Sequence, residues 1–476
     1  MRTRFSCIFL AVTASCYAAA PAADDAAALP AITTTRYEED YTVLRDVNVG
    51  RTAAPPSLAP IKFLPLDAAG GTYLTVGSEF RLRFESYDNN TWNEGPQDEG
   101  GYLWARALPY VDLHMGENVR AFGQLIVAVE WGDDAGIAPP DEDRLDLLQA
   151  FIDVRIPAGE NGSLLLRPGR QLMSYGSDRL IGVRYGPNVL QPFDAALVRF
   201  DQGPWRLDLF YARPVVIDRG AWDDEADNAQ SVWSLYATRQ LPSLGQGSGI
   251  DSYYIGFLDD DASFAQGSGR ELRHTLGMRF FGERGGLDWD LEGFYQFGTF
   301  STAAADGDIA AWSVASDVGF TFDAAPLRPR LGVRVNVISG DDDPDDDDLQ
   351  TFNALFPKGK YFGEIGLLGP YNLINVHPTL TLNLSERLAL DLASAVFWRY
   401  STDDGIYDNA GNVIRTGLDS DERFIGTQLE ATLTYTLSRE LEASATYGIF
   451  LPGSFIEETG PGEVVHFIGI ELTYRF

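Results

Sequence analysis

Arginines that recur at alternate positions are the residues of this sequence best suited to bind anions. Arg81 and Arg83 stand two residues apart, and Glu79 precedes Arg81 by the same spacing. A guanidinium can hold a carboxylate through two parallel hydrogen bonds, which a lysine ammonium cannot do. If every second residue faces a narrow water-filled lumen, such arginines raise the local concentration of anions. The candidate lumen arginines are Arg81, Arg83, Arg106, Arg167, Arg170, Arg279, Arg334, Arg399 and Arg475.

Acidic residues share the predicted lumen face and leave two roles open for these arginines. Glu79 and Asp153 are candidate partners, since each alternates in step with arginines on its own stretch. Pairing would stiffen the wall, whereas an excess of arginine would give a constriction a net positive charge. We expect both roles to occur. Arg170 is three residues from Arg167, so a regular strand would turn it to the other face.

Enzyme chemistry has no comparable signature in the chain. There is no G-x-S-x-G motif, no phosphate-binding loop and no paired-cysteine metal motif, and the four histidines stand on separate stretches. We therefore predict that the protein is not an enzyme and has no resident cofactor. The most densely acidic run, 341–348, could hold Ca²⁺ through Asp341, Asp343 and Asp345, because calcium prefers carboxylate oxygens. Its spacing matches no defined calcium-binding loop.

β-strands are the elements that would place alternate side chains on one face. In the last stretch, 464–476, Ile470 and Leu472 fall on one parity and Glu471 on the other. A period of two with one apolar and one polar face is that of a half-buried strand. About eighteen such runs follow one another along the chain. A strand with lipid on one side and water on the other must belong to a closed sheet, because the bilayer leaves an open edge unpaired.

Short and long connections alternate between these runs. Those at 116–118 and 438–439 are short, and those at 132–144, 259–269 and 340–370 are long. Short periplasmic turns and long extracellular loops are typical of outer-membrane barrels, and a soluble β-sandwich has no reason to sort its connections in this way. The sequence thus predicts an all-β fold, a transmembrane antiparallel β-barrel of about 18 strands in the bacterial outer membrane. No periplasmic turn is long enough to plug it.

The formal charge of −33 would repel an acidic solute if it were spread evenly. Most of the acid falls instead in the long connections, for example at 223–225, 259–261 and 341–348. Salt at physiological strength screens such charges over about 8 Å. An anion-preferring constriction is therefore compatible with the total charge, and we expect no nucleic-acid partner for so acidic a chain.

The N-terminus has the features of a targeting segment followed by a linker. Arg2 and Arg4 precede an apolar run, and small residues at 18–20 offer a cleavage site. Both cysteines lie within this stretch. The predicted divisions of the chain are a signal peptide at 1–23, an N-terminal periplasmic segment at 24–70 and the barrel at 71–476.

Several longer stretches resemble the alginate export family of outer-membrane porins. They are F-L-P-L (63–66) before G-S-E-F-R-L-R-F-E (77–85), R-P-G-R-Q (167–171) with S-Y-G (174–176) and R-L (179–180), S-G-D (339–341) with T-F-N-A-L-F-P (351–357) and Y-F-G-E (361–364), G-P-Y-N-L-I (369–374) with H-P (377–378), and E-E-T-G-P-G (457–462). The resemblance extends over nearly all of the chain after about residue 62. It implies a monomeric barrel of about 18 strands whose arginine-rich lumen passes an anionic polysaccharide outward.

Two other functions remain open at this point. One is a general or nutrient-uptake porin for small acidic or sugar solutes, which a polyuronate would not block. The other is a surface-binding or enzymatic barrel with a plugged lumen, which would not conduct. The partners expected of the chain are anionic polysaccharide or oligosaccharide, outer-membrane lipid and the barrel assembly machinery, for which the terminal Phe476 should matter. The sequence does not separate export from uptake.

Overall fold

Burial alternates along the strands in the sense opposite to that of a soluble protein. In β3 (Glu79–Asp88) the charged side chains of Arg81 and Arg83 are buried, whereas Phe80 and Leu82 are 48% and 49% exposed. Apolar residues outside and charged residues inside are expected where lipid surrounds a barrel and polar groups fill it. The faces predicted from the alternation are therefore confirmed on this strand.

A computed structural model of the chain describes residues 29–45, 59–97, 100–132, 136, 141–245, 247–303, 305–343, 345–417 and 419–476. The predicted signal peptide lies outside these residues. The helical pieces are short: η1 (Arg36–Glu38), η2 (Thr42–Arg45), α2 (Ala59–Lys62), α3 (Asn90–Asn93) and α4 (Ser454–Thr459). Within the described ranges, no helix is both long and apolar enough to cross a bilayer.

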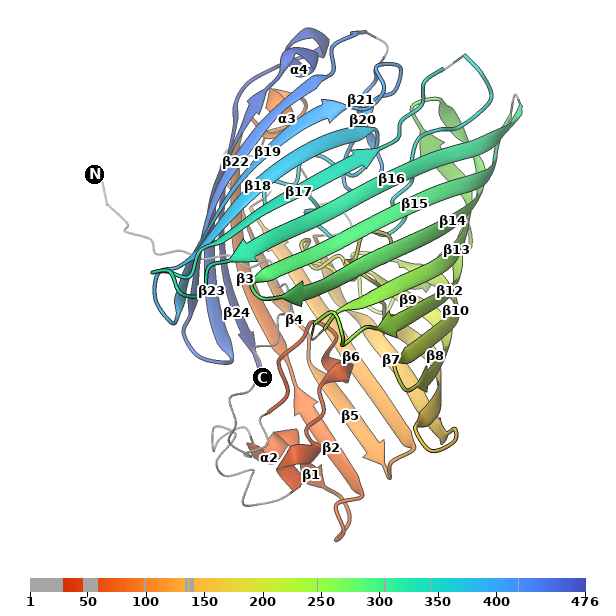
Figure 1. Ribbon diagram of the computed structural model, residues 1–476, viewed down its shortest axis with the longest axis vertical. Coiled ribbons are helices and arrows are strands. Elements are labelled where there is room, and N and C mark those ends of the chain that lie inside the picture. Colours follow the sequence, from red (N-terminus) through yellow and green to blue (C-terminus); the bar gives the residue numbers. More distant parts are fainter. Residues whose placement is uncertain are drawn as a thin grey trace.

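The strands pair antiparallel with their neighbours in sequence and wrap into one barrel (Figure 1). The short β1 (Leu64–Pro65) precedes the wall. The first two wall strands are interrupted: β2 (Thr72–Gly77) continues as β3, and β4 (Tyr102–Ala107) continues as β5 (Tyr110–Met115). The wall continues through β6 (Val119–Trp131), β7 (Asp143–Pro157), β8 (Gly162–Leu172), β9 (Pro192–Gln202), β10 (Trp205–Val216), the short β11 (Glu225–Ala226), β12 (Gln230–Gln240), β13 (Gly249–Phe264) and β14 (Gly267–Arg284). It is completed by β15 (Leu287–Thr302), β16 (Asp306–Thr321), β17 (Arg330–Ile338), β18 (Leu373–Asn383), β19 (Leu388–Arg399), β22 (Phe424–Thr436), β23 (Leu441–Pro452) and β24 (Val465–Arg475). With each interrupted strand taken as one and the two-residue pieces β1 and β11 set aside, eighteen strands form the wall, as predicted.

The sheet closes where the last strand meets the first. In Figure 1 the blue β24 runs beside the orange β3, and the pairing extends from His466 opposite Asp88 to Arg475 opposite Glu79. Beyond it the backbone of Phe476 exchanges two hydrogen bonds with Ser78, of 3.0 and 3.1 Å. No edge is left between these two strands, so the backbone groups that would face lipid are satisfied.

The alternation of short and long connections is confirmed over most of the barrel, but on the long-loop side the connections 265–266 and 303–305 are short. The stretch 259–269, predicted to be a long loop, instead continues β13 and β14 and turns only at 265–266. A register shift between Asp259 and Ala262 marks the point where this hairpin departs from regular pairing. Charged residues are compatible with a strand that projects past the lipid into water, so the acidic composition of this stretch did not imply a loop.

Two long connections fold inward and fill part of the lumen. We name residues 173–191 loop A and residues 339–372 loop B; each begins after a wall strand and returns to the next one. Buried apolar side chains of both loops pack against lumen-facing apolar residues of the wall to form the largest core cluster of the molecule. The loop members of that cluster are Met173, Leu180, Ile181, Leu349, Phe352, Ala354, Leu355, Phe356, Phe362, Ile365, Leu367, Leu368 and Tyr371. The hydrophobic core of this protein therefore lies inside the barrel.

Candidate channel constriction

Arg81 and Arg106 hold the backbone of loop A against the wall. Arg81 Nη2 donates to the carbonyl of Pro187 at 2.7 Å, and Arg106 Nη1 donates to the carbonyl of Asn188 at 3.0 Å. Both side chains are almost fully buried. A guanidinium offers five donors in a fixed plane, so it can serve carbonyls of a loop and a carboxylate of the wall at once.

Glu79 binds Arg106, and also Arg475 of the last strand, from the wall side. Its carboxylate accepts from Arg106 Nη2 at 2.6 Å and from Arg475 Nε at 2.8 Å. The hydroxyl of Tyr185 in loop A also donates to Glu79, at 3.1 Å. These contacts join the first wall strand, the last wall strand and loop A into one buried network.

Arg83 performs the corresponding task for loop B. Its guanidinium forms ion pairs with Glu85 at 2.6 Å, with Glu471 at 2.8 Å and with Glu364 of loop B at 2.5 Å. Lys360 of the same loop pairs with Glu85. Loop B is thus fixed to β3 by charge as well as by its apolar side chains.

Loops A and B also pair with each other inside the lumen. The amide of Phe356 donates to Leu180 O at 2.9 Å, and the amide of Gly182 donates back to Phe356 O at 2.9 Å. The amide of Lys358 donates to Asp178 O at 2.8 Å. The two loops therefore act as one inner element whose position is set from several sides.

The N-terminal segment, residues 29–45, reaches the lumen from the end of the barrel that carries the short turns. Tyr37 packs edge-on against the lumen-facing rings of Phe122 and Phe151, with centroids 6.0 and 5.3 Å away, and its hydroxyl donates to Leu172 O at 3.0 Å. The guanidinium of Arg167 lies 4.3 Å from the centroid of Tyr37. Arg167 is itself paired with Asp153 at 2.6 Å.

Arg36 ties this segment to the seam of the barrel. Its Nη2 donates to Phe476 O at 2.8 Å and its Nη1 donates to Ser78 O at 3.3 Å. Between the segment, the wall and the start of loop A lies a cavity of about 60 Å³. It is lined by Tyr37, Glu38, Arg167, Gln171, Leu172, Met173, Ser174, Tyr175, Leu197 and Arg199.

The other predicted arginines do not gather at one place. Arg170 lies opposite Ala150 and Asp194 in the sheet, and pairs with Asp194 at 2.8 Å rather than joining Arg167. Arg399 is fully buried and donates to carbonyls of the connection 400–423, which carries β20 (Ile406–Tyr407) and β21 (Val413–Arg415). Its acceptors are the carbonyls of Thr402, Asp404, Gly417, Ser420 and Glu422.

Arg279 and Arg334 lie near cations that the sequence reasoning did not single out. Arg279 Nη2 and Arg179 Nη1 of loop A both bind Asp290, at 2.7 and 2.9 Å. Arg334 Nε binds Asp317 at 2.8 Å. Lys358 of loop B has Arg334 and Arg179 as its nearest influential cations. We name Arg179, Arg279, Arg334 and Lys358 the constriction cluster.

Lys358 is a half-buried cation of loop B that lacks an acidic partner, as Arg184 of loop A and Arg399 also do within the described residues. Among the described residues its ammonium makes no ion pair with a carboxylate, and it lies 5.5 Å from the ring centroid of Tyr361. Burial, together with the positive charges of Arg334 and Arg179, lowers the pKa of Lys358 to about 8. The composition holds a signal for it: the chain has lysines only at 62, 358 and 360.

Exposure indicates which of these groups a solute can reach. The side chain of Arg334 is 30% exposed and that of its partner Asp317 is 26% exposed, whereas that of Arg81 is 1% exposed. The lumen face of β16 and β17 is therefore accessible, while the arginines beneath loops A and B are occupied.

The acidic run after β17 uses its carboxylates to fold its own backbone. Asp341 Oδ1 accepts the amide of Asp343 and Asp343 Oδ1 accepts the amide of Asp345, both at 3.1 Å. Asp341, Asp343 and Asp345 do not converge on one point. Within the described ranges, the carboxylates that lie close enough to share a metal ion are those of Asp146, Asp223 and Asp224.

Comparisons with known proteins agree with this architecture. The family model described as alginate export matches residues 72–470. Curated proteins give no match. Pseudomonas aeruginosa OccK2 (OpdF) in complex with glucuronate has a similar fold, with a TM-score of 0.55, 10% identity and coverage of 85% of this chain and 98% of that chain. OpdK with vanillate, from the same organism, gives a TM-score of 0.55 and 12% identity over 84% of this chain and 98% of that one.

Proposed function

This chain belongs to the alginate export family and forms a channel in the bacterial outer membrane, and we propose that the channel passes anionic polysaccharide or oligosaccharide of the alginate type. As an alginate export protein it is a channel rather than an enzyme. The solute would pass along the lumen face of β16 and β17 and beside the constriction cluster. There the carboxylates of a uronate chain would meet Arg334, Arg279 and Lys358.

The observation that carries this proposal is the unpaired ammonium of Lys358. Lys358 is half-buried, and a cation that has lost part of its hydration without a carboxylate partner gains from an anion that approaches it. The guanidinium of Arg334 is partly exposed, and the charges of Arg334 and Arg179 act on Lys358 more strongly than those of Asp178 and Asp317. An anionic solute would restore the missing partner, and a succession of carboxylates could do so as a polymer moves through.

The remaining predicted residues would act through the shape of the passage. Arg81, Arg83, Arg106 and Arg475, with Glu79, hold loops A and B in place, and we assign them to positioning the constriction. Arg167, paired with Asp153, would position the N-terminal segment. Arg399 would position the connection 400–423, and Arg170 would position the outer rim. Outer-membrane lipid covers the apolar face, and the assembly machinery would recognise the closing strand that ends in Phe476.

A second candidate function follows from how much of the lumen is filled. Loops A and B and the N-terminal segment all occupy the interior, which favours a solute smaller than a polymer. OccK2, of similar fold, is described in complex with glucuronate. A channel for small acidic or sugar solutes is therefore the alternative, and it would use the same cations.

Single-channel recording in planar bilayers tests the proposal. We expect the unmodified channel to prefer anions, and polyuronate to block its current at lower uronate concentration than monomeric glucuronate. Replacing Lys358→Gln together with Arg334→Gln should lower the ratio of anion to cation permeability on the order of tenfold and weaken the block. The control removes two exposed charges near the short turns, Arg284→Gln with Arg328→Gln, and should change neither quantity.

The recordings also separate the two candidates. Equal block by polymer and monomer would favour the small-solute channel. Cation preference in the unmodified channel would contradict both candidates, since both depend on the constriction cluster.

A further inference from the structure

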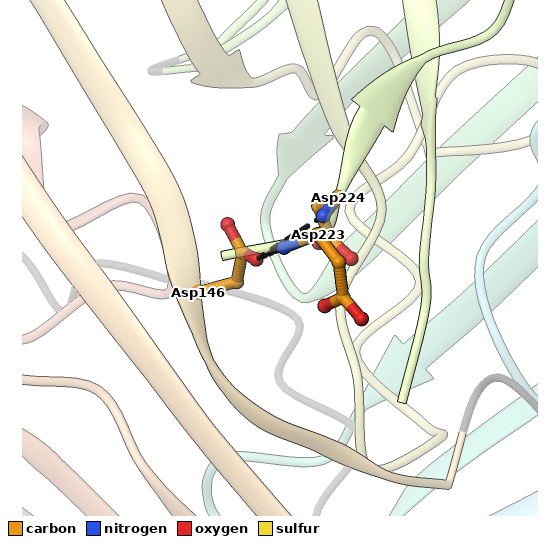
Figure 2. A group of neighbouring side chains, drawn as sticks. All are labelled: Asp146, Asp223 and Asp224. Carbon is orange, nitrogen blue, oxygen red and sulfur yellow. Dashed lines mark hydrogen bonds between the residues drawn. The ribbon is translucent and has the colours of Figure 1, made fainter. Parts of the chain in front are cut away.

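Three aspartates meet at the extracellular end of the barrel, far from the constriction cluster. Asp146 lies on β7, and Asp223 and Asp224 lie on the connection that follows β10 (Figure 2). One carboxylate oxygen from each residue lies within 4.8 Å of the other two. Like charges at this separation repel each other strongly unless something neutralises them.

The backbone holds these aspartates together. Asp146 Oδ2 accepts the amide of Asp223 at 2.9 Å and the amide of Asp224 at 3.2 Å, as the dashed lines of Figure 2 show. The amide of Trp222 donates to Leu145 O at 3.0 Å. The backbone of the connection is thus fixed to β7 beside the carboxylate of Asp146.

A fourth carboxylate, that of Asp143, supplies an independent observation. Asp143 is 0% exposed, and neither of its carboxylate oxygens forms a hydrogen bond of normal geometry with a described residue, the backbone amide of Leu145 being the donor that acts on it. The charges that act on it most are those of Asp224, Asp146 and Asp223. An ionised carboxylate buried in this way is among the costliest groups in a protein interior, so Asp143 must either hold a proton or be compensated by a cation.

The cations of the protein do not fill that role. Arg170 reaches Asp146 only at 3.9 Å, and its guanidinium is engaged by Asp194 at 2.8 Å. Arg144 and Arg219 pair with Glu142, at 2.6 and 3.6 Å. Four carboxylates therefore share at most part of one guanidinium.

We propose that Asp146, Asp223 and Asp224 bind one calcium ion at the extracellular rim, and that its charge compensates the buried carboxylate of Asp143. Calcium takes six to eight oxygen ligands in flexible geometry, which suits carboxylates from two separate segments. Asp223 is exposed, so the ion has access from outside and water can complete its coordination. The bound ion clamps the connection after β10 onto the end of β7.

Calorimetric titration of the full-length protein tests this site after treatment with a chelator. The unmodified protein should bind one Ca²⁺ at this site with a dissociation constant of roughly 10⁻⁴–10⁻³ M, the range of extracellular calcium modules. Asp143→Asn should weaken that binding about tenfold, because it removes a buried negative charge next to the ligands. Asp223→Asn with Asp224→Asn should abolish it.

The control is Asp342→Asn with Asp347→Asn, which removes the same charge from two exposed positions of the acidic run after β17. Its titration should match that of the unmodified protein. If Asp143→Asn fails to fold, the exposed Asp223→Asn alone should still weaken binding. No heat of binding up to about 10 mM Ca²⁺ would overturn the proposal. Unchanged Ca²⁺ binding in Asp143→Asn would also overturn the proposal, since the carboxyl of Asp143 would then hold a proton. An equal loss of Ca²⁺ binding in the control variant would overturn it as well.

Discussion

At the scale of single residues, the lumen contains two kinds of cation. Arginines such as Arg83 and Arg106 are buried in networks with carboxylates, where their charge is satisfied within the protein. Lys358 is half-buried and, within the described ranges, makes no ion pair with a carboxylate. A paired guanidinium stiffens the wall, whereas an unpaired ammonium remains available to a solute. The anion preference of the channel should therefore depend on Lys358 more than on the numerous paired arginines.

The charge of Lys358 makes anion preference depend on pH. Because its pKa is lowered to about 8, the ammonium is charged below that pH and neutral above it. Anion preference should therefore fall as pH rises from about 7 to about 9, with a midpoint near the pKa. Reversal potentials measured across this range check the expectation. Lys358→Arg should flatten the dependence, because a guanidinium keeps its charge; the same slope in both proteins would assign the effect to another group.

At the scale of elements, each wall strand presents one face to lipid and one to the interior. On β19, Leu392 is exposed to lipid and Ala393 faces the lumen opposite Glu430. Leu392→Arg should cost roughly 2–4 kcal/mol, the penalty for arginine near the bilayer midplane. Ala393→Arg should be tolerated, since Glu430 can pair with it. Folding into lipid vesicles under urea titration measures both, and equal losses would show that the faces are misassigned.

The wall could be predicted from the sequence because its signals are local. A period of two is visible within a few residues, and the alternation of short and long connections needs only neighbouring runs. The face of Arg81 follows from this parity, and so does the displacement of Arg170 from Arg167. The stretch 259–269 was misassigned because acidic residues suit a strand in water as well as they suit a loop.

The interior could not be predicted, because it is built from contacts between distant residues. Arg81 meets Pro187 across 106 positions, and Arg83 meets Glu364 across 281. The sequences of loops A and B have no hydrophobic periodicity that would indicate that they fold into the lumen. The sequence indicates that an arginine faces the lumen, but what occupies the lumen depends on tertiary packing. Lys358 was missed for this reason.

At the scale of the whole molecule, the lumen is narrowed from both ends. Loops A and B enter from the extracellular side, and residues 29–45 enter from the side of the short turns. Deleting 29–45 should raise single-channel conductance, because Tyr37 no longer occupies the space beside Phe122 and Phe151. Tyr37→Ala should reproduce part of the rise. Asp40→Ala, at an exposed position of the same segment, should leave conductance unchanged, and an unaltered conductance after the deletion would show that the segment does not obstruct the path.

The contact of Arg36 with the seam sets a chronology for biogenesis. Its two acceptors, Phe476 O and Ser78 O, come from the last and the first strand of the barrel. They lie close together only after β24 has paired with β3. Arg36, near the N-terminus, thus binds a site that is formed by the last residues of the chain to be synthesised. During insertion into the membrane, residues 29–45 therefore stay undocked in the periplasm. They bind at the seam only after the barrel has closed. Binding of Arg36 at the seam would therefore indicate that the barrel has closed.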